Sequence, residues 1–127
     1  MRVGASETDI TPPVGGWLLG RMGPSTGVHE PLYARALVAD DGHHPWIVIG
    51  MDLVGLSIEF SDELRAAIRA STGIETVLLN CSHNHSAPFS MPWSFGGWQQ
   101  HLREEVDWRN RLATALPKLA QAAADKM

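Results

Sequence analysis

Residues 76–88 read TVLLNCSHNHSAP and join an apolar run of strand length to a pair of histidines. Gly73 bounds the run upstream and Pro88 bounds it downstream, which is typical of a β-strand. Side chains alternate between the two faces of a strand, so His83 and His85 are predicted to point the same way, with Asn84 on the opposite side. The sequence therefore predicts two imidazoles in one pocket at the carboxyl end of this strand.

A histidine pair of this kind suits a divalent metal. Neutral imidazole is a common zinc ligand, and the H-x-H spacing brings two rings within reach of one ion. The alternative is that both histidines are polar residues at a strand end, bonded to backbone or water. Their place at a strand's carboxyl end, where open α/β sheets bind ligands, favours metal or substrate contact. Cys81 could add a thiolate, but a small buried residue is the simpler interpretation.

The composition is that of an ordinary globular chain, with 44% hydrophobic and 19% charged residues among 127. The formal net charge of -4 and the lack of a basic cluster argue against nucleic-acid binding. One cysteine allows no internal disulfide, which fits a reducing compartment. No apolar signal segment opens the chain, and no window approaches the roughly 18 apolar residues of a membrane span. We therefore expect a cytoplasmic protein without a transmembrane segment.

The first part of the chain is predicted to form three strands. Residues 3–10 read as a short edge strand that ends at a Thr-Pro-Pro turn, and an irregular glycine-rich loop follows over 14–24. Residues 31–40 and 45–54 form a predicted hairpin whose turn carries two histidines. The second hairpin strand is nearly continuous in apolar residues, which is typical of a strand covered on both faces.

A helix follows the hairpin. Ser57 or Ser61 is predicted to cap it, and residues 63–70 form its amphipathic centre. Strand, helix and strand with a short return form a βαβ unit, so residues 48–53 and 76–81 should be parallel neighbours with a right-handed crossover. The predicted fold class is α/β, a βαβ-containing mixed sheet with flanking helices.

The carboxyl-terminal part is predicted to be helical. Apolar residues recur at helical steps from Trp98 to Ala123, which indicates a helix over roughly the last thirty residues, with a break or kink at Pro117. The aromatic segment 89–98 before it has neither a strand period nor a helix period. That segment is either the wall of an apolar pocket or a loop that folds its aromatic side chains inward.

Asp52 is a carboxylate near the end of the most apolar strand. An unpaired buried charge is expensive, so Asp52 either reaches solvent or has a partner, for which Arg35 or a metal would serve. A structural ion pair and a functional role both remain open. Because parallel strands end at one edge of the sheet, Asp52 and His83 are predicted to lie close together there, with Arg35 or His29 as further contributors.

Four segments together resemble the amino-terminal region of the neutral/alkaline non-lysosomal ceramidases and their bacterial relatives. They are residues 4–13 (GASETDITPP), 29–36 (HEPLYARA), 51–53 (MDL) and 83–88 (HNHSAP), in the same order. Members of this family are zinc amidases that cleave the N-acyl bond of ceramide or related amides. The resemblance implies that residues 1–127 form a single domain, the amino-terminal portion of a larger catalytic domain, with Zn²⁺ as cofactor.

The resemblance also implies roles for single residues. The first histidine of the family's H-T-H-S-G-P motif binds zinc and the second lies beside the substrate, so His83 would be the metal ligand and His85 the catalytic, substrate-contacting residue. Arg35 is a further expected substrate contact, and Asp52 and His29 are additional candidates. This chain has Asn84 where the family has threonine. It has alanine at position 87 where the family has glycine, which would be strained if that backbone needed a positive φ.

The function implied by the resemblance is a zinc-dependent hydrolase of linear amides, in sphingolipid metabolism, with a small-molecule amide or lipid as substrate. The family's other zinc ligands, a later His, a Glu and a Tyr, would lie beyond residue 127. The alternative is a non-catalytic truncated product or interaction module that keeps the fold. We expect the 127-residue chain alone to bind zinc weakly, to hydrolyse little, and to self-associate through exposed apolar surface.

Overall fold

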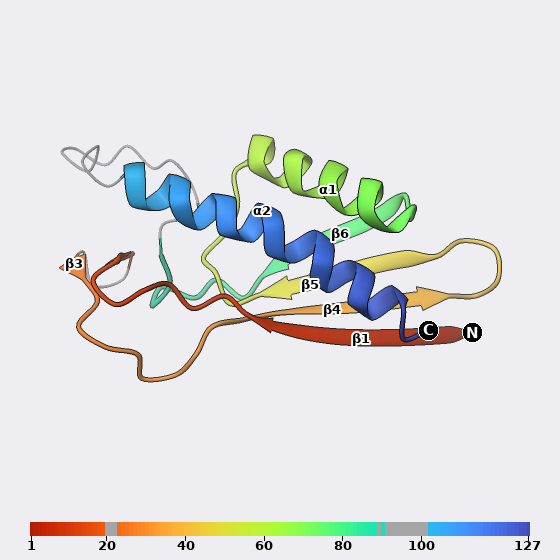
Figure 1. Ribbon diagram of the computed structural model, residues 1–127, viewed down its shortest axis with the longest axis horizontal. Helices are drawn as coiled ribbons and strands as arrows, with labels where there is room; N and C mark the ends of the chain where they lie inside the picture. The colour runs from red at the N-terminus through yellow and green to blue at the C-terminus, as the bar shows by residue number, and fades with distance from the viewer. Residues whose placement is uncertain (20–22, 89, 91–101) are drawn as a thin grey trace.

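A computed structural model describes residues 1–19, 23–88, 90 and 102–127 of the chain. In this part, two helices cover one face of a four-stranded sheet (Figure 1), and a separate pair of two-residue strands lies beyond the sheet's end. The elements are β1 (Arg2–Asp9), β2 (Trp17–Leu18), β3 (Gly23–Pro24), β4 (Tyr33–Asp40), β5 (Trp46–Met51), α1 (Ile58–Thr72), β6 (Thr76–Cys81) and α2 (Leu102–Ala124).

The sheet has the strand order β1-β4-β5-β6. β1 with β4 and β4 with β5 are antiparallel, whereas β5 and β6 are parallel. α1 connects the two parallel strands, so the predicted βαβ unit and the α/β fold class are confirmed. The predicted hairpin of β4 and β5 is also confirmed, and β1 is an edge strand as expected.

Helix α1 has both of its predicted end signals. Of the two candidate serines, Ser57 is the cap, because its Oγ accepts the N–H of Phe60 at 3.2 Å. Gly73 ends the helix with φ of 72° and donates its N–H to the Arg69 carbonyl. The buried residues of α1 fall on one stripe that faces the sheet, namely Phe60, Leu64 and Ile68.

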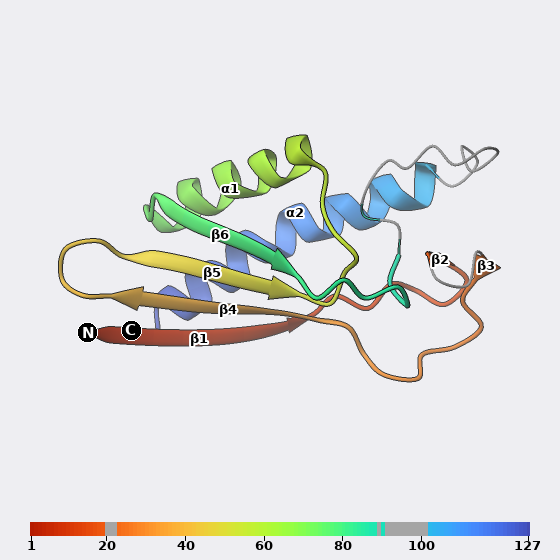
Figure 2. The same ribbon diagram turned by 180° about the vertical axis from the view of Figure 1, so that it is seen from behind.

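The prediction that the second hairpin strand is covered on both faces is wrong. In β5 the buried residues are Ile47, Ile49 and Met51, while the residues between them are half-buried. No described element packs on the face opposite the helices, which the reverse view shows uncovered (Figure 2). The near-continuous apolar run of β5 therefore supplies a core on one side and an apolar surface on the other.

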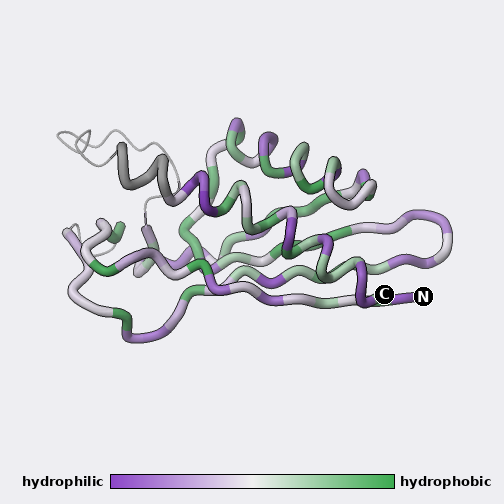
Figure 3. Tube along the Cα trace, viewed as in Figure 1, coloured by the Kyte–Doolittle hydropathy of each residue, from purple (hydrophilic) through white to green (hydrophobic). Residues whose placement is uncertain are grey.

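The core lies between the sheet and the helices. Figure 3 shows hydrophobic positions recurring along the inner strands and both helices. The largest fully buried side chains of the core come mainly from β5, α1, α2 and the loop after β5, and include Ile47, Phe60, Leu53, Leu112 and Leu116. Neither helix, over the residues that the structure describes, combines the length and hydropathy needed to cross a membrane.

Pro117 does not break the last helix, because α2 runs from Leu102 to Ala124 with the proline inside it. Proline lacks the N–H that a helix interior uses, a loss of about 3 kcal/mol. Packing of the buried Leu112, Leu116 and Leu119 against the sheet and α1 overrides that local cost. The aromatic segment 89–98, apart from Ser90, lies outside the described residues, so neither interpretation of that segment is tested.

The carboxyl end of α2 packs closely on β1 at Gly4. A Cβ at this position would overlap the Ala123 carbonyl oxygen, so only glycine fits between the strand and the helix. Lys126 donates from Nζ to the Ala5 carbonyl at 3.1 Å, beside this contact. These contacts place the two termini side by side at one corner of the molecule (Figure 1).

Candidate functional site

The histidine loop, residues 82–88, continues along the end of β5 after β6 has ended at Cys81. Ser82 donates its N–H to the Met51 carbonyl and Asn84 donates to the Leu53 carbonyl, both at 3.0 Å. Asp52 directly follows β5 and His83 comes two residues after the end of β6, so both lie at the same edge of the sheet, beyond the carboxyl ends of two neighbouring parallel strands. This is the edge at which open α/β sheets bind ligands.

The two imidazole rings pack against each other edge to face. Their centroids are 4.8 Å apart and the ring planes make an angle of 66°. The expectation that the rings lie together holds, but the reason for it was wrong. His83 has left the strand and adopts a left-handed backbone with φ of 61°, so strand alternation does not apply to it. Both side chains are exposed.

His83 is held by a residue far away in the sequence. Its Nδ1 lies 3.1 Å from the Val54 carbonyl oxygen, which can only accept, so Nδ1 carries the proton. The lone pair of the neutral ring is then on Nε2. A left-handed backbone costs a non-glycine residue about 1–2 kcal/mol, and this cost must be offset by contacts such as the one with Val54.

Alanine at position 87 causes no such strain. Among the described residues His83 is the non-glycine residue with a positive φ, and Ala87 is not. Ala87 is fully buried, and its carbonyl accepts the N–H of Leu19 at 3.1 Å. The departure from the family's glycine is therefore compatible with this backbone.

The other side of the histidine loop faces a cavity of about 500 Å³. Asn84 and Ser86 line it, and the Asn84 side-chain oxygen accepts the Ser86 N–H at 2.8 Å. His29 and Asp52 also line the cavity, whereas His83, His85 and Arg35 do not. The remaining lining residues lie before β2, in β2 itself, or between β3 and β4: Thr11, Pro12, Leu18, Ser25, Gly27, Val28, Glu30, Pro31 and Leu32.

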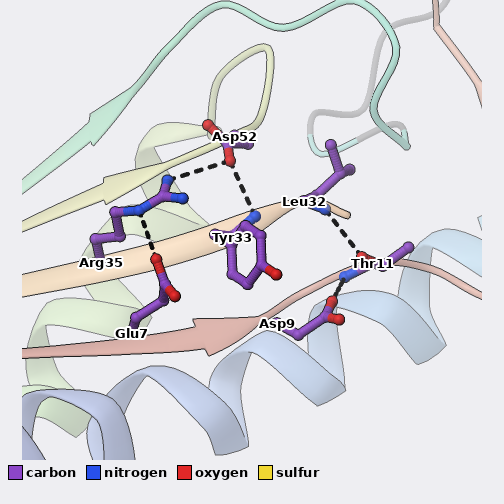
Figure 4. A network of polar contacts seen from close by, with 7 residues as sticks. All are labelled: Glu7, Asp9, Thr11, Leu32, Tyr33, Arg35 and Asp52. Atoms are coloured by element: carbon purple, nitrogen blue, oxygen red, sulfur yellow. Dashed lines mark hydrogen bonds and ion pairs between the residues drawn. The ribbon is translucent and has the colours of Figure 1, made fainter. Parts of the chain in front are cut away.

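Asp52 joins the end of β5 to β4 (Figure 4). Its Oδ2 accepts the Tyr33 N–H at 3.0 Å and a guanidinium N–H of Arg35 at 3.4 Å. Arg35 also donates from Nε to Glu7 at 2.8 Å, and its guanidinium lies over the Tyr33 ring at 4.9 Å. Arg35 is thus the partner of Asp52 that the sequence suggested. Its side chain is 55% exposed, so solvent screens the pair and its contribution is at most about 1 kcal/mol.

Cys81 behaves as a structural residue. It packs against the core, and burial raises the pKa of its thiol to about 11. The thiol is therefore protonated at neutral pH, which supports its interpretation as a small buried side chain. The structure brings the candidates into two groups, with His83 and His85 on one side of the loop and Asp52 and His29 around the cavity.

The described residues supply only part of the ligand set that a zinc ion needs. Among the described residues, no three His, Cys, Asp or Glu side chains lie close enough to hold one metal ion. A structural zinc site has four protein ligands, and a catalytic one has three plus an open position. His83 and His85 supply two imidazoles, so further donors would have to come from outside the described residues.

Sequence reasoning missed three features of this site. It could not identify the Val54 carbonyl, which no motif marks, or the left-handed backbone of His83. It named His29 as a candidate, but it missed the cavity that His29 lines together with the rest of the segment before β4. Asn84 does line the cavity while the two histidines do not, as predicted, although the loop backbone rather than strand alternation places it there.

Comparison with known proteins gives a fold but no sequence family. No protein-family model matches this sequence, and no curated protein matches it either. The crystal structure of neutral ceramidase from Pseudomonas aeruginosa is similar, with a TM-score of 0.74 and 18% identity over 98% of this chain and 21% of that chain. A ceramidase complexed with C2 is similar with a TM-score of 0.70, again at 18% identity over 98% of this chain and 21% of the other. The chain spans about a fifth of the length of these structures and has the fold of that part of them.

Proposed function

We propose that residues 1–127 form the amino-terminal portion of a zinc-dependent, ceramidase-like amidase, and that His83 is one of its metal ligands. The observation that carries this proposal is the His83 imidazole, held by the Val54 carbonyl at the edge where open α/β sheets generally bind ligands. The structural similarity to neutral ceramidases and the ordered sequence resemblance also support amide hydrolysis as the reaction class.

His83 would bind zinc through Nε2. Metal-binding histidines generally donate their other ring N–H to a carbonyl or a carboxylate, which fixes both the tautomer and the ring orientation. The bond from Nδ1 to Val54 provides that second contact here. The left-handed backbone at His83 turns the chain out of the strand and is the kind of strain that often accompanies functional residues.

His85 would contact the substrate. Bound zinc would polarise the amide carbonyl and lower the pKa of a bound water to about 7. His85 lies against the His83 ring and is exposed, so its imidazole can donate a hydrogen bond to the amide oxygen as negative charge develops there. Cleavage of the N-acyl bond then releases an amine and a carboxylate.

Arg35 and the cavity would hold other parts of the substrate. Glu7 and Asp52 use two guanidinium nitrogens of Arg35, which leaves the third for a substrate oxygen. The cavity combines polar residues, including Asn84 and His29, with apolar ones. Such a lining suits a small-molecule amide or lipid with both polar and apolar parts.

The second candidate function is a non-catalytic interaction module. The lack of a three-donor cluster among the described residues favours it for residues 1–127 taken alone. The two candidate functions differ in whether zinc should bind at His83. A catalytic portion uses His83 as a ligand, whereas an interaction module has no reason to bind zinc there.

The test is zinc affinity, measured by competition with a chelating dye. We expect weak binding by the 127-residue chain, a loss of about tenfold or more in His83→Ala, and a smaller loss in His85→Ala. His43→Ala is the matched control, because His43 is also exposed but lies in the hairpin turn. Equal weakening by His43→Ala, or no change in His83→Ala, would contradict the metal site.

Two further measurements separate the parts of the proposal. Long-range ¹H–¹⁵N NMR should show the Nδ1–H tautomer of His83 without any metal. A fluorescent N-acyl amide should be hydrolysed little by this chain alone, because two imidazoles do not complete a catalytic site. Sustained turnover together with one zinc retained after dialysis, both abolished in His83→Ala, would show that residues 1–127 suffice and that the expectation of low activity is wrong.

A further inference from the structure

Ser90 carries a buried hydroxyl that the proposed chemistry does not use. Its side chain is 1% exposed, and the residue lies in neither a helix nor a strand. Its Oγ donates to the carbonyl of Gly55, in the loop between β5 and α1. A buried hydroxyl without a partner is costly, so this bond fixes the position of the side chain. Because the hydroxyl is buried and already donates its proton, any role it has must act through Gly55.

The bond to Gly55 is one of three that the same short loop accepts from the histidine side. Asn84 donates its N–H to the Leu53 carbonyl at 3.0 Å. His83 donates from Nδ1 to the Val54 carbonyl at 3.1 Å. Three consecutive carbonyls of the loop after β5 therefore bind donors from the segment that carries the histidines, and the loop serves as the template on which that segment lies.

The three residues of this template are anchored in different ways. Leu53 is fully buried and Val54 is 5% exposed, so packing of their side chains holds both. Gly55 has no side chain to pack, and the bond from Ser90 supplies the anchor there. The Val54 carbonyl belongs to the planar peptide unit that ends at the Cα of Gly55. A shift of Gly55 therefore turns the carbonyl that His83 uses.

We propose that Ser90 is a positioning residue for His83. By holding Gly55, its hydroxyl keeps the Val54 carbonyl aimed at Nδ1, which keeps the proton on Nδ1 and the lone pair on Nε2. Contacts that orient a metal ligand typically change metal affinity by about 10–100-fold. The consequence for zinc rests on the proposed function, whereas the control of the tautomer does not.

The direct test is the tautomer of His83 in the metal-free chain, measured by long-range ¹H–¹⁵N NMR at about pH 8, where free imidazole side chains are neutral. Ser90→Ala removes the donor to Gly55, and we expect a mixture of Nδ1–H and Nε2–H forms in place of the Nδ1–H form alone. Ser61→Ala is the matched control, because Ser61 also donates from Oγ to a backbone carbonyl, that of Ser57 at 2.8 Å, but does so within the first turn of α1. Its His83 signals should match those of the wild type.

Zinc affinity is the second measurement, made by competition with the same chelating dye. We expect Ser90→Ala to weaken binding by about tenfold and Ser61→Ala to change it little. If the tautomer shifts in Ser90→Ala but zinc does not bind through His83, the proposed function fails and the positioning role stands. A folded Ser90→Ala chain that keeps only the Nδ1–H form would overturn the positioning role, whether or not His83 binds zinc.

Ser90→Cys keeps the proposal testable if Ser90→Ala does not fold. A thiol fills the buried site but is only a weak donor, so we expect a smaller shift of the His83 tautomer in the same direction. Circular dichroism confirms that each variant is folded. Unchanged His83 signals in Ser90→Cys, or equal shifts in Ser61→Ala and Ser90→Ala, would show that the Ser90 bond does not control the ring.

Discussion

The two ends of the sheet both carry aspartates and histidines, yet the contacts of these residues differ. At the β4–β5 turn, Asp40 accepts the N–H of Gly42 at 2.7 Å, and Asp41 accepts the backbone N–H groups of His43 and His44 at 2.9 and 3.0 Å. Each of these contacts spans at most three residues, and Asp40 also accepts a hydrogen bond from Arg2 of β1. The side chains thus shape the turn itself, and both histidines remain exposed.

At the other end, a histidine as well as an aspartate contacts distant parts of the chain. His83 contacts the Val54 carbonyl across 29 residues, and Asp52 accepts bonds from Tyr33 and Arg35 of β4. His83 also keeps a positive φ, which no residue of the turn except Gly42 does. A histidine with a long-range contact and a strained backbone, rather than the residue types, therefore distinguishes the candidate site from an ordinary turn.

The largest effect on stability is expected near the turn end, where β1 meets α2. Gly4→Ala should lower the free energy of unfolding by about 1–3 kcal/mol, because the new Cβ meets the Ala123 carbonyl. Gly50→Ala is the matched control, since no atom lies within 4 Å of its added Cβ. Urea denaturation measures both variants, and the His83 NMR signals should not move. Equal losses in the two variants would show that the close approach at Gly4 is not what matters.

A smaller effect should distinguish the histidines of the two ends. His83→Ala keeps the strained backbone and loses the Val54 bond, whereas His83→Gly relieves the strain, so the glycine variant should be more stable by about 1 kcal/mol. At His43, which has no positive φ, the glycine variant should be no more stable than the alanine variant. Thermal unfolding of the four variants decides this. An equal gain in stability from glycine over alanine at both positions would show that the backbone strain is not specific to His83.

The smallest effect is a pH dependence at the turn end. The hydrogen bond from Arg2, followed by the one from the Gly42 N–H, lowers the pKa of Asp40 below its ordinary value. A lowered folded-state pKa gives stability that is present above the unfolded pKa of about 3.9 and is lost as the pH falls through the folded pKa. Asp40→Asn should therefore lower the melting temperature at pH 7 and converge with the wild type near pH 2. A difference in melting temperature that stays constant from pH 7 to pH 2 would contradict the lowered pKa of Asp40.

Most of the fold could be predicted from local patterns. Alternating apolar residues and turn signals located the strands of the sheet, and Ser57 and Gly73 marked the ends of α1. What local patterns could not predict depends on packing. The continuous apolar run of β5 looked buried on both faces, although only one face meets a helix. The helical packing that carries α2 through Pro117 is likewise invisible to local propensity.

The candidate site was predictable only in part. The H-x-H spacing predicted adjacent imidazoles, and the lone carboxylate at the strand end suggested Arg35 as a partner of Asp52. The contact with Val54 and the left-handed backbone at His83 arise from how the loop leaves β6, which no spacing rule contains. Metal ligation by His83 and substrate contact by His85 remain predictions for the zinc experiments.

The adjacent termini have a consequence for how this unit can be handled. Met1 and Met127 lie at one corner, at the end of the sheet opposite the histidine loop (Figure 1). A label or carrier domain attached at this corner would therefore lie far from the imidazoles and would leave the edge of the sheet that carries them accessible.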